Sequence, residues 1–287
     1  MLLTGVIVKG IGGFYYIKAE DGAVYECKAR GVFRKEKIKP MIGDVVRIES
    51  DGEKGNIVAI KPRKTELIRP SVANIDTLVI VAATASPEPN LFLIDKMLVL
   101  SEQQGIRPIL CLNKEDLHSG DELEKIYRTA GYPVVRVSAK TGEGVAELRA
   151  LILGKTSAFT GLSGVGKSSI LTLLLDAVLQ TGAVSDKIQR GKHTTRHVEL
   201  FELPGGGFVL DTPGFSSLEA EGITASELYG YFPELAEVTG CRFKGCSHIS
   251  EPDCAVKALL AQGKIAASRY ESYKALYELL KQKKDWE

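Results

Sequence analysis

The stretch from residue 161 to residue 169 constrains the fold more than any other part of the chain, because it reads G-x-x-x-x-G-K-S-S. A strand-like run, residues 157–160, leads into it, and a helix-like run, residues 169–179, follows it. In that setting the glycines let backbone N–H groups and the helix N-terminus face a phosphate group. A glycine-rich turn without a ligand is the alternative, but the flanking strand and helix favour a phosphate-binding loop.

We therefore predict that this loop holds the phosphates of a nucleotide. Lys167 is expected to reach the β- and γ-phosphates and to neutralise charge during phosphoryl transfer, and the Ser168 hydroxyl is expected to bind Mg²⁺. The predicted nucleotide-binding residues of the loop are Gly161, Leu162, Ser163, Gly164, Val165, Gly166, Lys167, Ser168 and Ser169.

Strand-like and helix-like runs alternate between residues 70 and 217. We expect strands at residues 76–83, 109–112 and 134–137, with helices at 92–104 and 122–130 between them. This alternation is typical of a parallel α/β sheet, in which ligands bind at the carboxyl ends of the strands. The residues at those strand ends are therefore candidates for the binding site.

Two short motifs follow the second and third of these strands. The first reads N-K-E-D and contributes Asn113, Lys114 and Asp116, and the second reads S-A-K and comprises Ser138, Ala139 and Lys140. Either motif alone is weak evidence, but together with the phosphate-binding loop they form one constellation.

That constellation predicts guanine recognition. The Asp116 carboxylate can accept hydrogen bonds from both N1–H and the 2-amino group of guanine, whereas adenine would leave it unpaired. The Lys114 side chain can lie over the base and sugar, and the Ala139 N–H can donate to the guanine 6-oxygen. The nucleotide is therefore expected to be GTP.

Two segments after the phosphate-binding loop are candidates for switch regions. Residues 191–196 read G-K-H-T-T-R, and Thr195 there is predicted to complete the coordination of Mg²⁺. A strand at residues 208–210 ends in a D-x-x-G motif. Its Asp211 is expected to hold Mg²⁺ through water, and its Gly214 N–H is expected to sense the γ-phosphate.

The order of these motifs differs from the usual one, because a Ras-type G domain begins with the phosphate-binding loop and ends with N-K-x-D and S-A-K, whereas here N-K-x-D and S-A-K come first. The same parts can surround one nucleotide if the ends of the domain have been rejoined elsewhere, which is a circular permutation. The D-x-x-G motif then leads directly into the C-terminal segment. Loss of the γ-phosphate would release or reorient that segment.

The N-terminal residues have the pattern of a small β-barrel. Five short runs rich in Val, Ile, Tyr and Phe, separated by turn signals, occur at residues 3–8, 14–19, 24–29, 44–49 and 56–60. This spacing predicts an OB-fold. Basic residues cluster between Lys28 and Lys39 near several aromatic residues, which favours contact with RNA. The alternative is a solvated basic loop over a barrel whose aromatic residues form the core.

Three of the five cysteines lie close to a histidine near the C-terminus. Cys241, Cys246, His248 and Cys254 form C-x₄-C-x-H-x₅-C, which suits tetrahedral Zn²⁺. Four protein ligands leave no open coordination position, so we expect one structural Zn²⁺ per chain. Reduced surface thiols beside a chance histidine are the alternative.

Helix-like runs surround this cluster. The run at residues 265–281 carries Tyr270, Tyr273 and Tyr277 at helical spacing, which favours packing over a stacking surface for bases. The other two cysteines, Cys27 and Cys111, are expected to be buried thiols.

Composition excludes few classes of protein. The net charge is +1, although basic residues outnumber acidic ones in residues 1–64 and acidic residues outnumber basic ones in residues 218–287. No apolar run is long enough to span a membrane, and the first residues lack the pattern of a signal peptide. We therefore expect a soluble, cytoplasmic protein without a membrane partner.

With its motifs in this order, the chain resembles the circularly permuted, ribosome-small-subunit-dependent GTPases of the RsgA type, formerly YjeQ or YloQ. The resemblance covers an OB-fold domain at residues 1–64, a permuted GTPase domain at 65–217 and a helical zinc-binding domain at 218–287. It implies late maturation of the small ribosomal subunit, contact with its rRNA, and GTP hydrolysis to GDP and phosphate that the subunit stimulates. It also implies zinc at the same four positions. We expect a monomer, because the partner is large and asymmetric.

The catalytic group for hydrolysis is the least constrained prediction. Ras-type enzymes place a glutamine directly after D-x-x-G, but Phe215 stands there, so the isolated protein should be slow. The family's G-[RK]-H-T-T motif matches this chain and makes His193 the candidate. The alternatives are that His193 binds RNA or only shapes the loop, and Arg190 and Arg196 are weaker candidates.

Two other functions remain open on the sequence. One is a GTP-gated RNA-binding switch whose hydrolysis is incidental, and the phenylalanine after D-x-x-G leaves this alternative open. The other is a nucleotide-dependent transporter or metabolic enzyme, but no membrane segment or second substrate site supports it.

Overall fold

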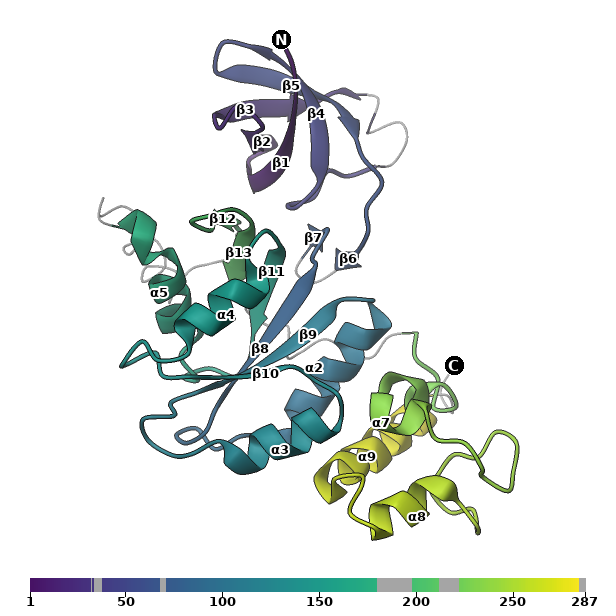
Figure 1. Ribbon diagram of the computed structural model, residues 1–287. Coiled ribbons are helices and arrows are strands. Elements are labelled where there is room, and N and C mark those ends of the chain that lie inside the picture. Colours follow the sequence, from purple (N-terminus) through teal and green to yellow (C-terminus); the bar gives the residue numbers. More distant parts are fainter. Residues whose placement is uncertain (32, 34–37, 68–70, 180–197, 212–221, 284–287) are drawn as a thin grey trace. The chain divides into compact units, whose positions relative to one another are not determined.

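The computed structural model covers residues 1–287 and describes all of them except 32, 34–37, 68–70, 180–197, 212–221 and 284–287 (Figure 1). The chain divides into two compact units, each built from segments that are distant in sequence. The first contains Met1–Leu78, Arg149–Thr160 and the described residues of 167–215. The second contains Val79–Leu148, Gly161–Gly166 and the described residues of 216–287.

A closed five-stranded barrel forms the N-terminal part of the first unit (Figure 1). Its strands, in the order β1-β2-β3-β5-β4, are β1 (Leu2–Ile11), β2 (Phe14–Ala19), β3 (Val24–Ala29), β5 (Lys54–Ile60) and β4 (Val45–Asp51). Neighbouring strands are antiparallel except for β3 and β5, which are parallel. Alternate residues such as Ile17 and Ile48 are fully buried, as expected when one face of each strand lines a core. The predicted OB-fold barrel is confirmed.

The barrel leads into a short antiparallel pair, β6 (Glu66–Leu67) and β7 (Val72–Ala73), which the sequence did not predict. A partly buried ion pair lies at this junction, where Arg63 Nε donates to Asp44 Oδ1 at 2.7 Å. The fully buried Asp44 also accepts a bond from the Met41 N–H. These bonds replace the contacts with water that the Asp44 carboxylate loses on burial, as a buried charge requires.

The first unit also contains three strands of the α/β region. They are β11 (Thr156–Thr160), β13 (Phe208–Asp211) and β12 (Phe201–Glu202), in the order β11-β13-β12. β11 and β13 are parallel, and β12 is antiparallel to β13. Helix α5 (Lys167–Leu179) packs on β13.

The second unit holds β8 (Thr77–Ala83) from Val79 onward, together with β9 (Arg107–Asn113) and β10 (Val134–Val137), in the order β10-β9-β8. β9 and β10 are parallel, and every residue of β8 is buried, as a strand covered on both faces requires. Helices α2 (Leu91–Gln103) and α3 (Asp121–Thr129) pack on β9 and β10, respectively. The predicted parallel α/β arrangement is confirmed, and helix α4 (Val145–Ile152) was not predicted.

The C-terminal part of the second unit is helical and packs around its own apolar core. Its elements are the 3₁₀-helix η2 (Leu228–Tyr231), α7 (Pro233–Ala236), α8 (Ala255–Ala261) and α9 (Ala267–Lys283). Tyr270 and Tyr273 lie in the core with Phe232 and with Val99 of α2. The tyrosine stripe therefore packs, as predicted, and α2 and α9 are neighbours.

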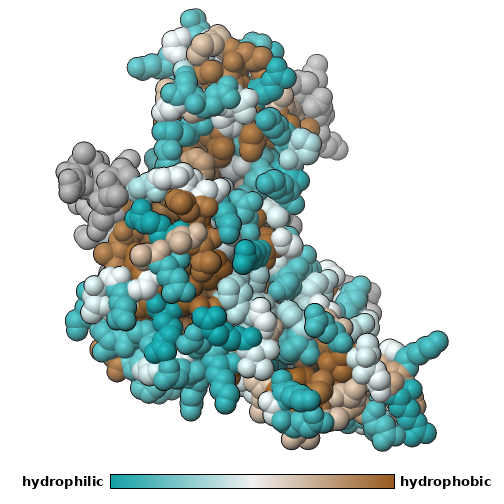
Figure 2. Space-filling model, viewed as in Figure 1, coloured by the Kyte–Doolittle hydropathy of each residue, from teal (hydrophilic) through white to brown (hydrophobic). Residues whose placement is uncertain are grey.

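Most of the surface seen in Figure 2 is hydrophilic, and apolar residues gather in separate patches. Within the described part of the chain, none of the helices combines the length and the apolar character needed to cross a membrane.

Candidate functional site

The phosphate-binding loop depends on glycine at two positions where the chain passes other groups closely. A Cβ at Gly166 would lie 2.2 Å from Nδ2 of Asn113, and a Cβ at Gly161 would lie 2.1 Å from the Val81 carbonyl oxygen. Both glycines have positive φ angles, 97° and 140°, which L side chains rarely adopt. The spacing G-x-x-x-x-G thus follows from backbone geometry and from contact with neighbouring strands.

Two side chains of the N-K-E-D motif bind this loop within the second unit. Asn113, at the end of β9 and 1% exposed, donates from Nδ2 to the Val165 carbonyl oxygen at 2.7 Å. The Lys114 ammonium donates to the carbonyl oxygen of Gly164 at 2.8 Å and to that of Ser86. Motifs that are about fifty residues apart in sequence are therefore joined directly.

Asp116 is held as an ionised acceptor. Ser138 donates from Oγ to its Oδ1 at 2.8 Å, and the Lys140 ammonium lies 3.7 Å from its Oδ2. The hydrogen bond from Ser138 lowers the pKa of Asp116 below its ordinary value, and the charge of Lys140 adds to the effect. An acceptor-only carboxylate suits the two N–H donors on the edge of guanine.

The Ala139 N–H already has a partner within the protein. It donates to Oδ1 of Asn113 at 3.0 Å, which orients the asparagine amide. Its predicted bond to the guanine 6-oxygen remains a prediction, and a bound base would share or displace this contact.

The variable position of N-K-x-D also has a structural role, which the sequence analysis missed. Glu115 accepts bonds from the Gly120 N–H at 3.0 Å and from Nε of Arg136 at 2.8 Å. Arg136, on β10, also pairs with Asp121. This network fixes the loop that carries the residues predicted to recognise the base. The only signal in the sequence was an arginine within the apolar run of residues 134–137.

Lys167 and Asp211 lie in the first unit and are both partly buried. Burial lowers the pKa of Lys167, and the nearby Asp211 partly opposes this shift. Burial also raises the pKa of Asp211, and Lys167 partly opposes that shift. Among the described residues, no donor is within hydrogen-bonding distance of the buried Oδ1 of Asp211. A carboxylate oxygen that is buried without a hydrogen-bond donor suits a site that binds a cation such as Mg²⁺.

Several predicted residues lie outside the described part of the chain. These are Arg190, His193, Thr195, Arg196, Gly214 and Phe215. Their predicted roles in the switch segments remain predictions.

The four predicted zinc ligands come together in the second unit. Their ligand atoms all lie within 4.8 Å of one another, and Nδ1 of His248 is 3.6 Å from Sγ of Cys241 and 3.4 Å from Sγ of Cys254. Such separations match the edges of a tetrahedron with metal–ligand bonds of about 2.0–2.3 Å. Burial lowers the pKa of His248 and so favours the neutral imidazole that binds metals. The cluster is compatible with zinc.

Residues around the cluster fix its loop. Glu251 accepts bonds from the N–H and Oγ of Ser247, both at 2.7 Å. Burial opposes ionisation of Glu251, but the bonds from Ser247 outweigh it and lower its pKa to about 2. Tyr270 and Tyr273 of α9 donate to the carbonyl oxygens of His248 and Ser247, each at 2.6 Å. The metal-ligand loop is thereby attached to α9.

Comparison with known families identifies the chain. The model of the RsgA GTPase family matches residues 60–221, and that of the RsgA N-terminal domain matches residues 4–58. The chain belongs to the RsgA GTPase family. It is 48% identical to a small ribosomal subunit biogenesis GTPase RsgA from Agathobacter rectalis, covering 99% of this chain and 100% of the relative. It is 47% identical to the RsgA of Caldanaerobacter subterraneus, covering 98% and 97% of the two chains.

Solved structures in this family share the fold. The YjeQ crystal structure from Thermotoga maritima is 36% identical and superposes with a TM-score of 0.84, covering 98% of this chain and 99% of that one. YloQ, described as a circularly permuted GTPase, is also 36% identical, with a TM-score of 0.83 and coverage of 99% and 96%. The resemblance inferred from the motif order is confirmed.

Proposed function

We propose that this chain is a GTPase that acts in late maturation of the small ribosomal subunit, hydrolysing GTP to GDP and phosphate with stimulation by the subunit. The observation that carries this proposal is the pair of bonds from Asn113 and Lys114 to the phosphate-binding loop. They link the motif that selects guanine to the loop that holds phosphate. The names of the RsgA relatives supply the biological setting.

In this proposal the base and the phosphates are bound by separate sets of residues. Asp116 accepts from N1–H and the 2-amino group, the Lys114 stem covers the base, and the segment 138–140 closes the pocket around its 6-oxygen. Residues 161–169 bind the phosphates through backbone N–H groups and Lys167.

Mg²⁺ would be held by Ser168, Thr195 and, through water, Asp211. Bound with GTP, the ion would supply positive charge that neutralises the phosphates. Oδ1 of Asp211, which has no hydrogen-bond partner among the described residues, supports this assignment.

Hydrolysis needs a group that orients the attacking water, because Phe215 cannot do so. His193 is the proposed group, Lys167 stabilises the charge on the transferred phosphoryl group, and the Gly214 N–H contacts the γ-phosphate. We expect slow turnover until the ribosomal subunit orders this arrangement.

The cysteine–histidine cluster is proposed to bind one structural Zn²⁺ through Cys241, Cys246, His248 and Cys254. Four ligands with satisfied neighbours would stabilise the loop and leave no open position for chemistry.

The barrel is proposed to contact rRNA. The Lys28 ammonium lies 4.8 Å from the centre of the Phe14 ring, so a cation and an aromatic ring occur together on the barrel. We propose a division into the barrel at 1–64, the GTPase domain at 65–217 and the zinc-binding domain at 218–287. A monomer in the cytoplasm, without a membrane partner, is part of the same proposal.

The test is steady-state hydrolysis by the purified protein, with and without purified small ribosomal subunits, and with ATP as the control nucleotide. The proposal predicts slow GTP turnover alone, strong stimulation by the subunits, and no ATP turnover. Equal turnover with and without subunits would contradict it.

A second candidate function is a GTP-gated RNA-binding switch with incidental hydrolysis, because the phenylalanine after D-x-x-G cannot orient the attacking water. That candidate predicts subunit binding that depends on GTP, with turnover that the subunits do not raise.

A further inference from the structure

The loop between β8 and α2 lies outside the recognised guanine-binding motifs, yet it contacts them. Thr84, directly after β8, donates from its N–H to the Asn113 carbonyl oxygen at 2.9 Å. Its hydroxyl donates to the Lys114 carbonyl oxygen at 2.9 Å. Thr84 is 7% exposed, so both bonds are shielded from competition with water.

The hydroxyl bond matters because of the backbone conformation at Lys114. Its φ angle is 71°, in the left-handed region that is unfavourable for a residue with a Cβ atom. Something must hold the lysine there, and the Thr84 hydroxyl binds the carbonyl group of that same residue.

The loop between β8 and α2 also binds the ammonium group at the end of the Lys114 side chain. This ammonium donates to the carbonyl oxygens of Ser86 and Gly164. The aliphatic stem of Lys114 therefore extends between the β8–α2 loop and the phosphate-binding loop. This stem is the part that would cover the base of a bound nucleotide.

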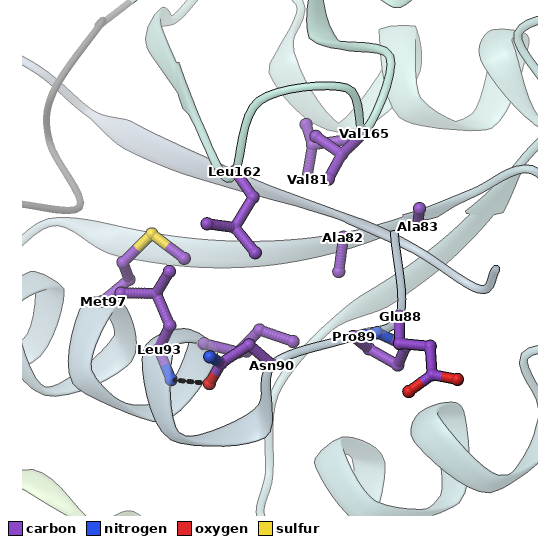
Figure 3. A pocket seen from close by; sticks show the side chains of 11 residues that line it. Val81, Ala82, Ala83, Glu88, Pro89, Asn90, Leu93, Met97, Leu162 and Val165 are labelled. Atoms are coloured by element: carbon purple, nitrogen blue, oxygen red, sulfur yellow. Dashed lines mark hydrogen bonds between the residues drawn. The ribbon is translucent and has the colours of Figure 1, made fainter. Parts of the chain in front are cut away.

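The β8–α2 loop is itself anchored and so can serve as a support. Asn90 ends it as the N-cap of α2, with Oδ1 accepting from the Leu93 N–H at 3.0 Å (Figure 3). The same figure shows Leu162 of the phosphate-binding loop pointing toward Leu93 and Met97 of α2, and these three residues line a small apolar pocket together with Val165.

We propose that Thr84 is a positioning residue of the guanine-nucleotide site. Its hydroxyl holds the Lys114 backbone in the left-handed conformation that presents the lysine stem to the base. This inference rests on the proposed function, because it assumes that Lys114 contacts a guanine nucleotide. It adds a residue outside the N-K-x-D, S-A-K and phosphate-loop motifs.

The test measures the dissociation constant for GDP of the full-length protein. Thr84→Val keeps the shape of the side chain and removes the donor, so GDP should bind about threefold to tenfold more weakly, the range of one hydrogen bond. Thr84→Ser keeps the donor and should restore affinity to within about twofold. Thr77→Val is the matched control, because Thr77 is fully buried in β8 and its hydroxyl has no partner among the described residues.

A double-mutant cycle separates positioning from a general loss of stability. In a Lys114→Ala background, Thr84→Val should change GDP affinity by less than about twofold, because the side chain being positioned is gone. A loss that is equal in both backgrounds would overturn the inference, as would wild-type affinity in Thr84→Val alone. If the wild-type protein does not bind GDP, the proposed function fails as well, whereas an unchanged Thr84→Val variant refutes only this inference.

Discussion

Arg269 carries a positive charge into the interior of the second unit, where its side chain is 1% exposed. Its Nη1 donates to Oδ1 of Asp95 on α2 at 2.7 Å, and its Nε and Nη2 donate to the Glu234 carboxylate at 2.7 and 3.1 Å. The guanidinium also lies 4.5 Å from the centre of the Phe232 ring. This cluster connects α9, which holds the metal-ligand loop, to α2 and α7.

Replacing Arg269 should lower the free energy of unfolding far more than replacing a surface cation. Arg269→Met keeps a long straight side chain but leaves two buried carboxylates without their partner. The expected loss is about 3–5 kcal/mol in the free energy of unfolding. On the same helix, Lys274 pairs with Glu271 at 2.8 Å on the surface, and Lys274→Met should cost less than about 1 kcal/mol.

The loss in the free energy of unfolding of Arg269→Met should also depend on pH. Burial already raises the pKa of Asp95 in the wild-type protein, and Arg269 opposes that shift. Without Arg269 the pKa rises further, so the folded variant holds a proton that the unfolded chain releases. Stability of the variant is then retained below the ordinary pKa of an aspartate and falls as pH rises toward the raised value. The deficit should therefore be smaller at pH 5 than at pH 8.

Urea unfolding followed by far-ultraviolet circular dichroism, with zinc present and nucleotide absent, measures these free energies. Asp95→Asn in the Arg269→Met background should recover part of the loss, because it removes one buried charge. The reasoning is refuted if Arg269→Met costs no more than Lys274→Met, or if its cost is the same at both pH values.

Three further predictions concern the binding sites. Gly166→Ala should abolish measurable GDP binding while the protein stays folded, because the new Cβ would meet the Asn113 amide at 2.2 Å; unchanged affinity would contradict the loop geometry. Cys246→Ser should lower the zinc content from one ion per chain and reduce the melting temperature by at least about 5 °C, whereas Cys27→Ala should keep its zinc. His193→Ala should lower subunit-stimulated turnover by about 10²–10⁴-fold with GDP affinity unchanged, and full turnover in this variant would remove His193 from catalysis.

The local parts of the fold were predictable because they depend on short-range patterns. β2, β3 and β10 have the predicted bounds, since runs of β-branched and aromatic residues end at clear turn signals. The phosphate-binding loop and N-K-E-D motif were also recognisable, because their spacing reflects backbone geometry that only a few residues satisfy. The cysteine–histidine cluster was recognisable because four metal-binding side chains occur within fourteen residues of sequence.

The features that were missed arise from tertiary contacts. β12 has two residues and exists because it pairs with β13. Helix α4 follows a short polar turn, and its eight residues carried too weak a pattern. The burial of Arg269 has no local signal, because its partner Asp95 is 174 residues away. The bond from Thr84 to Lys114 likewise links two strand ends that local sequence cannot pair.

The measurement we would make first is a comparison of GDP and xanthosine diphosphate binding by the wild-type protein and by Asp116→Asn. Guanine offers two donors to the Asp116 carboxylate, whereas xanthine offers one donor and one acceptor, which pair with an asparagine amide. We expect Asp116→Asn to lose GDP affinity by at least about 100-fold and to gain affinity for xanthosine diphosphate. Asp51→Asn, an exposed barrel residue, should behave as wild type. If Asp116→Asn binds GDP as tightly as the wild-type protein, the permuted motifs do not form the guanine site described above.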